Sequence, residues 1–356
     1  MVSIASLGSH SALEVSHGAA KHGIKTIVFC ERGRDKQYNY YLKTKRKHST
    51  VGIIDTLVRM DKFADIIRKD NIDFMLQNDT VFVPNRSFSV YVGYDAIENR
   101  FPVPIFGNRK MLRAEERDAK PNQYDLLGKA NVKYPLSFKP EEIDRPVIVK
   151  VNERQRKYER AFFIAMDGKD YELKSEEMIR KGAISEEALA TARIEELIIG
   201  PQFNFNFFYS PIEESLELIG IDTRRQANVD GFAKLPYWLQ PKIDFKTIEV
   251  GHIACTLRES LLSKVYDVGE KILSASQEMF GRGIIGPFAI QSMIIADKEK
   301  EDIVVFDLSF RMPGSPGIKY TPYSEFLYIN SISMGERIAI EILNAEKDNA
   351  LKDVTS

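Results

Sequence analysis

The first hundred residues alternate between short hydrophobic runs and segments with helical spacing. The predicted order is a strand at Val2–Leu7, a helix at Ser11–His22, a strand at Lys25–Cys30, a helix at Arg59–Asp70, and strands at Asp73–Leu76 and Val81–Pro84. Strands that alternate with helices form a parallel sheet, which binds ligands beyond the carboxyl ends of its strands. We therefore expect His10, Ser87 and the turn Arg32–Asp35 to lie at a binding edge.

After residue 109 the pattern changes to longer helices and antiparallel strands. The middle region predicts a helical stretch Lys110–Ala130 interrupted at Pro121, a strand pair Val147–Val151 and Ala161–Met166, helices Ser175–Lys181 and Ser185–Ala192, and a strand Ile194–Ile199. The last region predicts strands Phe203–Tyr209 and Ser215–Thr223 around a turn, a helix Arg258–Phe280, a hairpin of Phe288–Ala296 with Asp302–Phe310, and a helix Met334–Asn344. No low-complexity linker separates the regions, so we expect the lobes to pack closely.

Composition narrows the class of protein. The 356 residues include 50 basic and 51 acidic side chains, so a net charge of -1 gives no electrostatic reason to expect nucleic acid as a partner. Two cysteines, Cys30 and Cys255, indicate neither a disulfide framework nor a zinc site. No apolar run approaches the ~20 residues of a membrane span. We expect a cytoplasmic protein with no membrane contact.

Two segments carry candidate chemistry. Gly8-Ser9-His10-Ser11 joins a strand to a helix, a turn whose free backbone N–H groups attract phosphate. Far downstream, Asp307, Ser309 and Arg311 alternate along a predicted strand and would project from one face, where they suit a metal and a polyphosphate. A phosphorylated substrate at one place and a nucleotide at the other indicate an ATP-using enzyme.

Several short motifs follow one another in the order of a known family. They are Leu7-Gly8-Ser9-His10, Arg32-Gly33-Arg34-Asp35, Pro104-Ile105-Phe106-Gly107-Asn108-Arg109, Ile194-Glu195-Glu196, Phe207-Phe208-Tyr209-Ser210-Pro211, Arg258-Glu259-Ser260-Leu261-Leu262 and Gly286-Pro287-Phe288. In this order the chain resembles the archaeal formate-dependent aminoimidazole carboxamide ribotide (AICAR) formyl ligases, the PurP proteins of the ATP-grasp superfamily.

The resemblance implies an α/β and α+β fold: an ATP-grasp architecture with a Rossmann-like N-terminal domain. The implied domains are residues 1–108 facing the ribotide, a central lobe 109–200 with a flap at 152–160, and a C-terminal lobe 201–356 with the metal and phosphate strands. It implies formylation of AICAR by formate and ATP through formyl phosphate, with release of ADP and phosphate, in purine biosynthesis. Mg²⁺ or Mn²⁺ would assist, and the relatives' multimers imply a homo-oligomer.

The resemblance also implies roles for individual residues. His10, Ser87 and His252 match positions that bind the ribotide. Lys150, Arg156, Glu195 and Glu196 are expected to bind ATP, Gln291 and Asp307 to bind the metal, and Arg311 to act on the phosphate. Gln226 lies in the segment Arg224–Asn228, which could meet the ribotide phosphate or the nucleotide or be a surface turn; we assign it to ATP.

Some positions differ from the family's pattern. The flap 152–160 contains no glycine, although only glycine lets backbone N–H groups approach phosphates closely. Asp125 replaces a nucleotide-facing lysine, Asn206 replaces a common histidine, His252 replaces a frequent asparagine, and Gln291 offers a neutral oxygen. Two alternatives therefore stay open: an impaired paralogue that binds purine nucleotide or ribotide, and a ligase with another carboxylate and amine.

Overall fold

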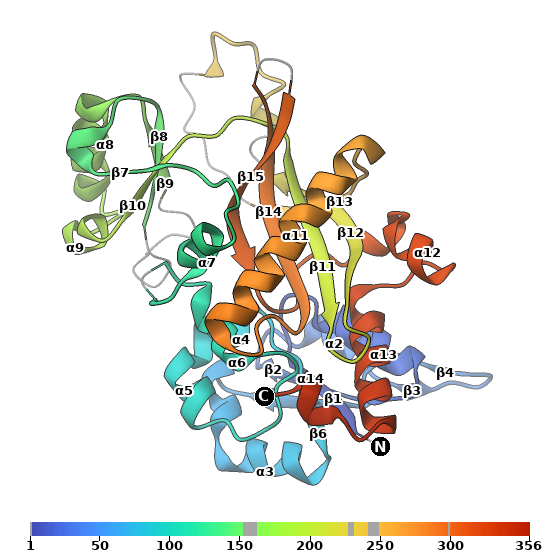
Figure 1. The fold of residues 1–356 in the computed structure, drawn as a ribbon. Coiled ribbons are helices and arrows are strands. Elements are labelled where there is room, and N and C mark those ends of the chain that lie inside the picture. Colours follow the sequence, from blue (N-terminus) through green and yellow to red (C-terminus); the bar gives the residue numbers. More distant parts are fainter. Residues whose placement is uncertain (1, 118, 152–161, 227–230, 241–248, 298–299) are drawn as a thin grey trace.

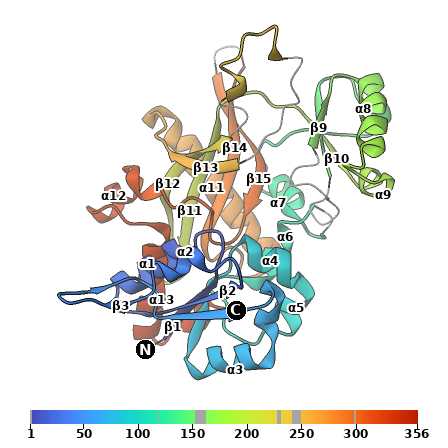
Figure 2. The same ribbon diagram turned by 180° about the vertical axis from the view of Figure 1, so that it is seen from behind.

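The computed structural model describes residues 2–117, 119–151, 162–226, 231–240, 249–297 and 300–356. Figures 1 and 2 show an N-terminal domain at one end, a large sheet rising from it, and a small lobe beside that sheet. The first sheet has the order β5-β2-β1-β6, with all neighbours parallel. The elements of the N-terminal domain are β1 (Ser3–Leu7), α1 (Ala12–Lys21), β2 (Lys25–Glu31), α2 (Lys36–Asn39), the separate hairpin β3 (Thr44–Lys45) and β4 (Thr50–Val51), β5 (Thr56–Met60), α3 (Lys69–Gln77), β6 (Thr80–Phe82), α4 (Arg86–Val92) and α5 (Tyr94–Asn99). The predicted parallel sheet is confirmed.

The segment from residue 56 to residue 77 differs from the prediction. The predicted helix Arg59–Asp70 and strand Asp73–Leu76 are wrong, because β5 and a 3₁₀ turn occupy the first and α3 covers the second. Short apolar runs do not distinguish a strand from a helix by period alone. In α3 the run lies on a helix that buries Met75, whereas the residues of β5 pair with β2.

The central lobe is a small antiparallel sheet covered by helices. It follows the helices α6 (Arg109–Ala114) and α7 (Gln123–Lys129) and contains β7 (Ser137–Phe138), β8 (Val147–Lys150), β9 (Phe162–Ala165), α8 (Gly168–Arg180), α9 (Glu186–Ala190) and β10 (Arg193–Glu196). The strand order is β7-β10-β8-β9, and α8 and α9 lie on the outer side (Figure 1). The predicted pairing of β8 with β9 is confirmed. The flap 152–160 between them lies outside the described residues.

The C-terminal lobe is built on a five-stranded antiparallel sheet of order β13-β12-β11-β14-β15. Its elements are β11 (Gln202–Ser210), β12 (Ser215–Gln226), β13 (Glu249–Ala254), α11 (Glu259–Phe280), β14 (Gly286–Asp297), β15 (Lys300–Ser309), α12 (Tyr323–Tyr328), α13 (Met334–Lys347) and α14 (Leu351–Val354). The helix α11 crosses one face of this sheet (Figure 1), where Val265 and Ile272 pack against Phe207 and Phe288. Both predicted hairpins and the helices at 258–280 and 334–344 are confirmed, whereas β13 and α12 were not predicted.

The C-terminal helix α13 joins this lobe to the N-terminal domain. It packs against α1, and Gly18 of α1 faces Gly335 so closely that a Cβ on either glycine would overlap the backbone of the other helix. The carboxylate of Glu14 accepts a hydrogen bond from the backbone N–H of Met334, 3.1 Å away. Arg337 of α13 is buried between Glu217 of β12 and the next turn of its own helix. The two domains therefore share one core, as close packing of the lobes requires.

The contact between α1 and α13 can be tested by adding one methyl group. We expect Gly18→Ala to lower the free energy of unfolding by about 1–3 kcal/mol or more, because the helices must separate to make room. Urea denaturation measures this change. Gly231→Ala is the matched control, because Gly231 has open space around its Cα. Equal stability of the two variants would contradict the close approach.

Candidate active site

The loop after β1 is held in place by side chains from the β6–α4 connection. Asn85 donates from Nδ2 to the carbonyl oxygens of Leu7 at 2.9 Å and His10 at 3.2 Å. The Ser87 hydroxyl donates to the Ser9 hydroxyl at 2.6 Å. The sequence prediction that His10 and Ser87 lie at one edge of the parallel sheet therefore agrees with their placement.

The same loop reaches the C-terminal lobe. Ser11 donates from its hydroxyl to the carbonyl oxygen of Pro313 at 2.5 Å. A methyl group on the neighbouring Gly314 would lie 3.9 Å from both His10 Nδ1 and His252 Nε2. His10 and His252, predicted from distant parts of the chain to bind one substrate, thus border the same small space.

His252 is fixed by two carboxylates. Its Nδ1 lies 2.5 Å from Oδ2 of the buried Asp222, and its Nε2 lies 3.2 Å from Oε1 of Glu249. Asp222 also accepts hydrogen bonds from the side-chain amides of Asn204 and Asn206, at 2.9 and 2.7 Å. Burial acts to lower the pKa of His252, but Asp222 and Glu249 raise it to about 9. Burial likewise opposes ionisation of Asp222, but His252 and the two amides hold its pKa below the ordinary value.

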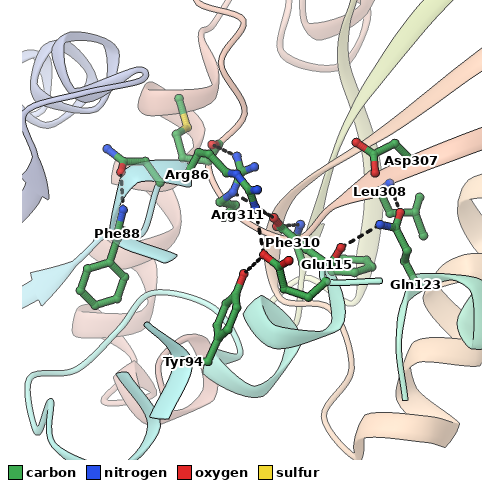
Figure 3. A network of polar contacts seen from close by, with 12 residues as sticks. Arg86, Phe88, Tyr94, Glu115, Gln123, Asp307, Leu308, Phe310 and Arg311 are labelled. Atoms are coloured by element: carbon green, nitrogen blue, oxygen red, sulfur yellow. Dashed lines mark hydrogen bonds and ion pairs between the residues drawn. The ribbon is translucent and has the colours of Figure 1, made fainter. Parts of the chain in front are cut away.

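A second buried carboxylate organises the end of β15 (Figure 3). Glu115, directly after α6, accepts the backbone N–H of Phe310 at 2.8 Å and lies 3.2 Å from Nε of Arg311. Arg86 approaches the same carboxylate at 3.5 Å. Burial raises the pKa of Glu115 even though both guanidinium groups oppose this, and burial lowers the pKa of Arg311. The N-terminal domain and the last sheet therefore meet at one carboxylate.

Gln123 of α7 extends this contact along β15. Its side-chain oxygen accepts the N–H of Leu308, and its amide group donates to the carbonyl oxygen of Glu115, both at 2.8 Å. Because β15 is an edge strand of its sheet, its outward backbone groups need such partners. Glu115 and Gln123 together fix the strand that carries Asp307 and leads into Arg311.

Gln291 and Asp307 face each other across β14 and β15. The Gln291 amide donates to Asp307 Oδ2 at 3.0 Å, while its oxygen accepts from Arg224. No group of three or more His, Cys, Asp or Glu side chains suited to a metal occurs within the described ranges. Mg²⁺ commonly binds through one or two carboxylates together with substrate phosphates, so Asp307 fits as a ligand. Gln291 fits only if its oxygen exchanges Arg224 for the ion.

Lys150 and Glu195 form a buried ion pair in the central lobe. Lys150 Nζ lies 2.5 Å from Glu195 Oε2, and Arg193 Nε lies 2.6 Å from the other oxygen. Burial opposes ionisation of Glu195, but Lys150, Tyr124 and Arg193 lower its pKa. Lys150 also lies 5.6 Å from the ring centre of Phe306 on β15. The pair therefore stands where the central lobe meets the strand of Asp307.

Three further residues were predicted to bind ATP: Gln226, Glu196 and Arg156. Gln226 ends β12 and pairs in register with Glu249. Glu196 is half-buried, with Arg145 3.8 Å from its carboxylate. Arg156 belongs to the undescribed segment. Asp125 caps α7, because its carboxylate accepts the N–H of Asn122 at 2.9 Å.

Sequence reasoning missed three residues that organise the site: Arg86, Glu115 and Asp222. A signal existed for Asp222, because Asn204 and Asn206 interrupt an otherwise aromatic strand on one face and predict a polar partner. Arg86 stands beside Ser87 at a strand end, a position that sequence reasoning already marked. Glu115 carried no signal, because its partner Phe310 is 195 residues away.

Comparisons with known proteins agree across the whole chain. Residues 4–138 match the family described as "Protein of unknown function (DUF1246)", and residues 170–356 match "Domain of unknown function (DUF1297)". A 5-formaminoimidazole-4-carboxamide-1-(beta)-D-ribofuranosyl 5'-monophosphate synthetase from Methanopyrus kandleri is 36% identical, covering 100% of this chain and 95% of the relative. The synthetase of the same name from Methanocaldococcus jannaschii is 35% identical, over 96% of this chain and 91% of the relative.

Solved structures show the same fold. An IMP biosynthesis protein PurP from Thermococcus kodakaraensis superposes with a TM-score of 0.75 at 27% identity, covering 99% of this chain and 100% of that one. An N5-carboxyaminoimidazole synthetase from Staphylococcus aureus, complexed with ADP, gives a TM-score of 0.57 at 13% identity over 89% of this chain and 72% of that one. None of the helices in the described part of the chain is both long and apolar enough to cross a membrane.

The role of Glu115 can be tested through stability. We expect Glu115→Ala to lower the free energy of unfolding by about 3–5 kcal/mol, because it leaves buried Arg311 and the Phe310 N–H without their partner. Glu115→Gln should cost less, since an amide oxygen can still accept the N–H. Urea denaturation compares them, with the exposed Glu141→Ala as control. Wild-type stability of Glu115→Ala would rule out this role.

Proposed function

The chain belongs to the family of 5-formaminoimidazole-4-carboxamide-1-(beta)-D-ribofuranosyl 5'-monophosphate synthetases, and we propose that it is an ATP-dependent ligase that formylates the 5-amino group of AICAR with formate. ADP and phosphate are the other products, and the product ribotide is an intermediate of purine biosynthesis. The observation that carries the proposal is that three sets of polar residues, one from each lobe, meet around β15: the His10 loop, the Lys150–Glu195 pair, and the row that includes Asp307.

The ribotide binds at the N-terminal side of this meeting point. His10, Ser87 and His252 line that side, and Arg86 adds a cation beside Glu115. Guanidinium groups bind phosphate oxygens through charge-assisted hydrogen bonds. AICAR carries one phosphate, which the Arg86 guanidinium suits.

ATP binds between the central lobe and the large sheet. Lys150 stands at the end of β8 and meets the phosphates, while Glu195 and Arg193 set its position. Because Glu195 is wholly buried in that ion pair, we assign contact with the adenosine part to the neighbouring Glu196 and to the backbone of this strand. Gln226 and Arg156 complete the ATP contacts.

Asp307 holds a divalent cation, Mg²⁺ or Mn²⁺, and Gln291 can join it. When bound, the ion neutralises charge on the phosphates and orients them. Arg311, fixed by Glu115 at the end of β15, stabilises charge on the transferred phosphoryl group. Phosphoryl transfer depends mainly on positioning and on charge stabilisation, so this chain needs no side-chain nucleophile.

The reaction then has two steps. A formate oxygen attacks the γ-phosphorus and displaces ADP, which gives formyl phosphate. The amine of AICAR attacks the formyl carbon, and phosphate leaves. The residues of this chain contribute by holding formate, ATP and ribotide in line at the junction of the three lobes.

An impaired paralogue that binds ribotide or nucleotide is the second candidate. One observation favours it: the oxygen of Gln291 already accepts from Arg224, and the only carboxylate of the pair, Asp307, already accepts from the Gln291 amide. A ligase for another carboxylate and amine would bind its substrates in the same place. ADP release that requires formate and AICAR together distinguishes the proposed ligase from these two alternatives.

The proposal extends to assembly and location. Large apolar side chains in and beside α12 are exposed, among them Tyr320, Phe326 and Ile329. Exposed apolar side chains that gather in one place mark contacts between proteins, so we propose a homo-oligomer. A cytoplasmic location stays a prediction from the sequence.

Asp307→Asn tests the assignment of the metal site. We expect it to lower turnover roughly 100-fold or more, because charge stabilisation in the transition state is lost, while AICAR binding stays unchanged. ADP release and calorimetric titration with AICAR measure the two effects. Asp302→Asn, an exposed carboxylate of the same strand, is the control. Equal loss of binding and turnover would count against the assignment.

A further inference from the structure

The space beside Gly314 is bordered by two imidazoles that come from different lobes. His10 lies in the loop after β1, and His252 lies on β13. A methyl group on Gly314 would be in ordinary van der Waals contact with a ring nitrogen of each, at 3.9 Å. The chain keeps a glycine there without a positive φ angle, so backbone conformation does not demand it. The two rings therefore flank the same point of the chain, one from each lobe.

We infer that the two histidines divide the second step of the reaction between them. His10 accepts the proton of the attacking amine, and His252, held by Asp222, binds the phosphate group that leaves. Asp222 is a positioning residue, because it acts through His252 and touches no reacting atom. The inference rests on the proposed function and assigns chemistry within that site.

The local charges separate the two rings. His252 faces Asp222 and Arg224 of β12, Glu249 of its own strand, and Ser315 at 3.2 Å, and the two carboxylates keep it protonated. Burial is the largest cause that lowers the pKa of His10, and the charges of Arg311, Arg86 and His252 act in the same direction. Among the described residues, Glu249 opposes them. Titratable groups whose environments push their pKa values apart are the mark of an acid and base pair.

Glu249 lets His252 exchange partners. Its two carboxylate oxygens lie 3.2 Å from His252 Nε2 and 3.2 Å from Arg224 Nη1. A phosphate that arrives beside Gly314 can take the Nε2–H while Glu249 keeps Arg224 as a partner. Asp222 meanwhile holds Nδ1, so the ring keeps its orientation and its charge.

The step balances with these roles. The amine nitrogen forms a bond to the formyl carbon, and the bond from that carbon to the phosphate oxygen breaks, with its electron pair on phosphate. The proton lost by the nitrogen goes to His10. The negative charge gained by phosphate faces the His252 imidazolium. Nothing is oxidised or reduced, and no further reactant is needed.

The pH dependence of product formation tests the inference. At saturating ATP, formate and AICAR, we expect turnover to fall on the acid side, at a pH below the ordinary pKa of histidine, as His10 becomes protonated, and to fall above about pH 9 as His252 loses its proton. Asp222→Asn should move the basic limb down by about 1–3 pH units, because the imidazolium loses its charged partner. His10→Asn should remove the acid limb, and added imidazole should restore part of the rate to His10→Ala.

Two controls and one further variant keep the test decisive. Asp61→Asn and His48→Asn change exposed residues of the N-terminal domain and should leave both limbs in place. If Asp222→Asn does not fold, Glu249→Gln should shift the basic limb in the same direction by a smaller amount. A basic limb that stays at its wild-type position in a folded Asp222 or Glu249 variant overturns the role of His252. An acid limb that persists in His10→Asn overturns the role of His10.

The outcomes also separate this inference from the proposed function. Wild-type protein that releases no ADP with ATP, formate, AICAR and Mg²⁺ would refute the ligase itself. If the wild type releases ADP with formate but the limbs of the pH profile do not move in the variants, only the roles of the two histidines are refuted. Gly314→Ala adds a geometric readout: it should slow formyl transfer at unchanged stability, because its methyl group would contact His10 Nδ1 and His252 Nε2 at 3.9 Å, on the side from which a substrate reaches both.

Discussion

The arrangement of the whole molecule depends on the buried carboxylate of Glu115. One oxygen accepts the N–H of Phe310, the residue that follows the edge strand β15, and the other faces Arg311 and Arg86. A buried charge is tolerated only when it is paired and hydrogen-bonded, so these partners must stay in place together. The carboxylate at the end of α6 therefore holds the N-terminal domain and the last sheet in fixed positions relative to each other.

The large sheet has two different faces. On one face α11 covers aromatic and aliphatic side chains, and the opposite face carries a row in cross-strand register, from Asp222 through Asn204 and Gln291 to Asp307. Side chains alternate along a strand, so each strand supplies both the core and the row. The side chains of this row hydrogen-bond to one another, so they can be buried without a ligand. A substrate that brings donors and charges of its own can replace these hydrogen bonds.

Most elements of this fold could be predicted from the sequence, because their hydrophobic patterns are local. The alternation in residues 203–223 identified β11 and β12, and the helical spacing of 258–280 identified α11. The prediction failed at 59–77, where short apolar runs fit either kind of element. For the site, strand ends located His10 and Ser87. The carboxylates of Glu115 and Asp222, which hold Arg311 and His252, depend on contacts between distant segments, which no local pattern encodes.

The contact between α1 and α13 also bears on how the protein is made. Glu14 and Met334, which hydrogen-bond to each other, are 320 residues apart in the chain. At ribosomal elongation rates the second helix follows the first after roughly 15–60 s. Throughout that interval the side of α1 that meets α13, where Gly18 faces Gly335, has no native cover. The newly made N-terminal domain is therefore exposed on this side until α13 is synthesised, and we expect chaperones that bind nascent chains to cover it.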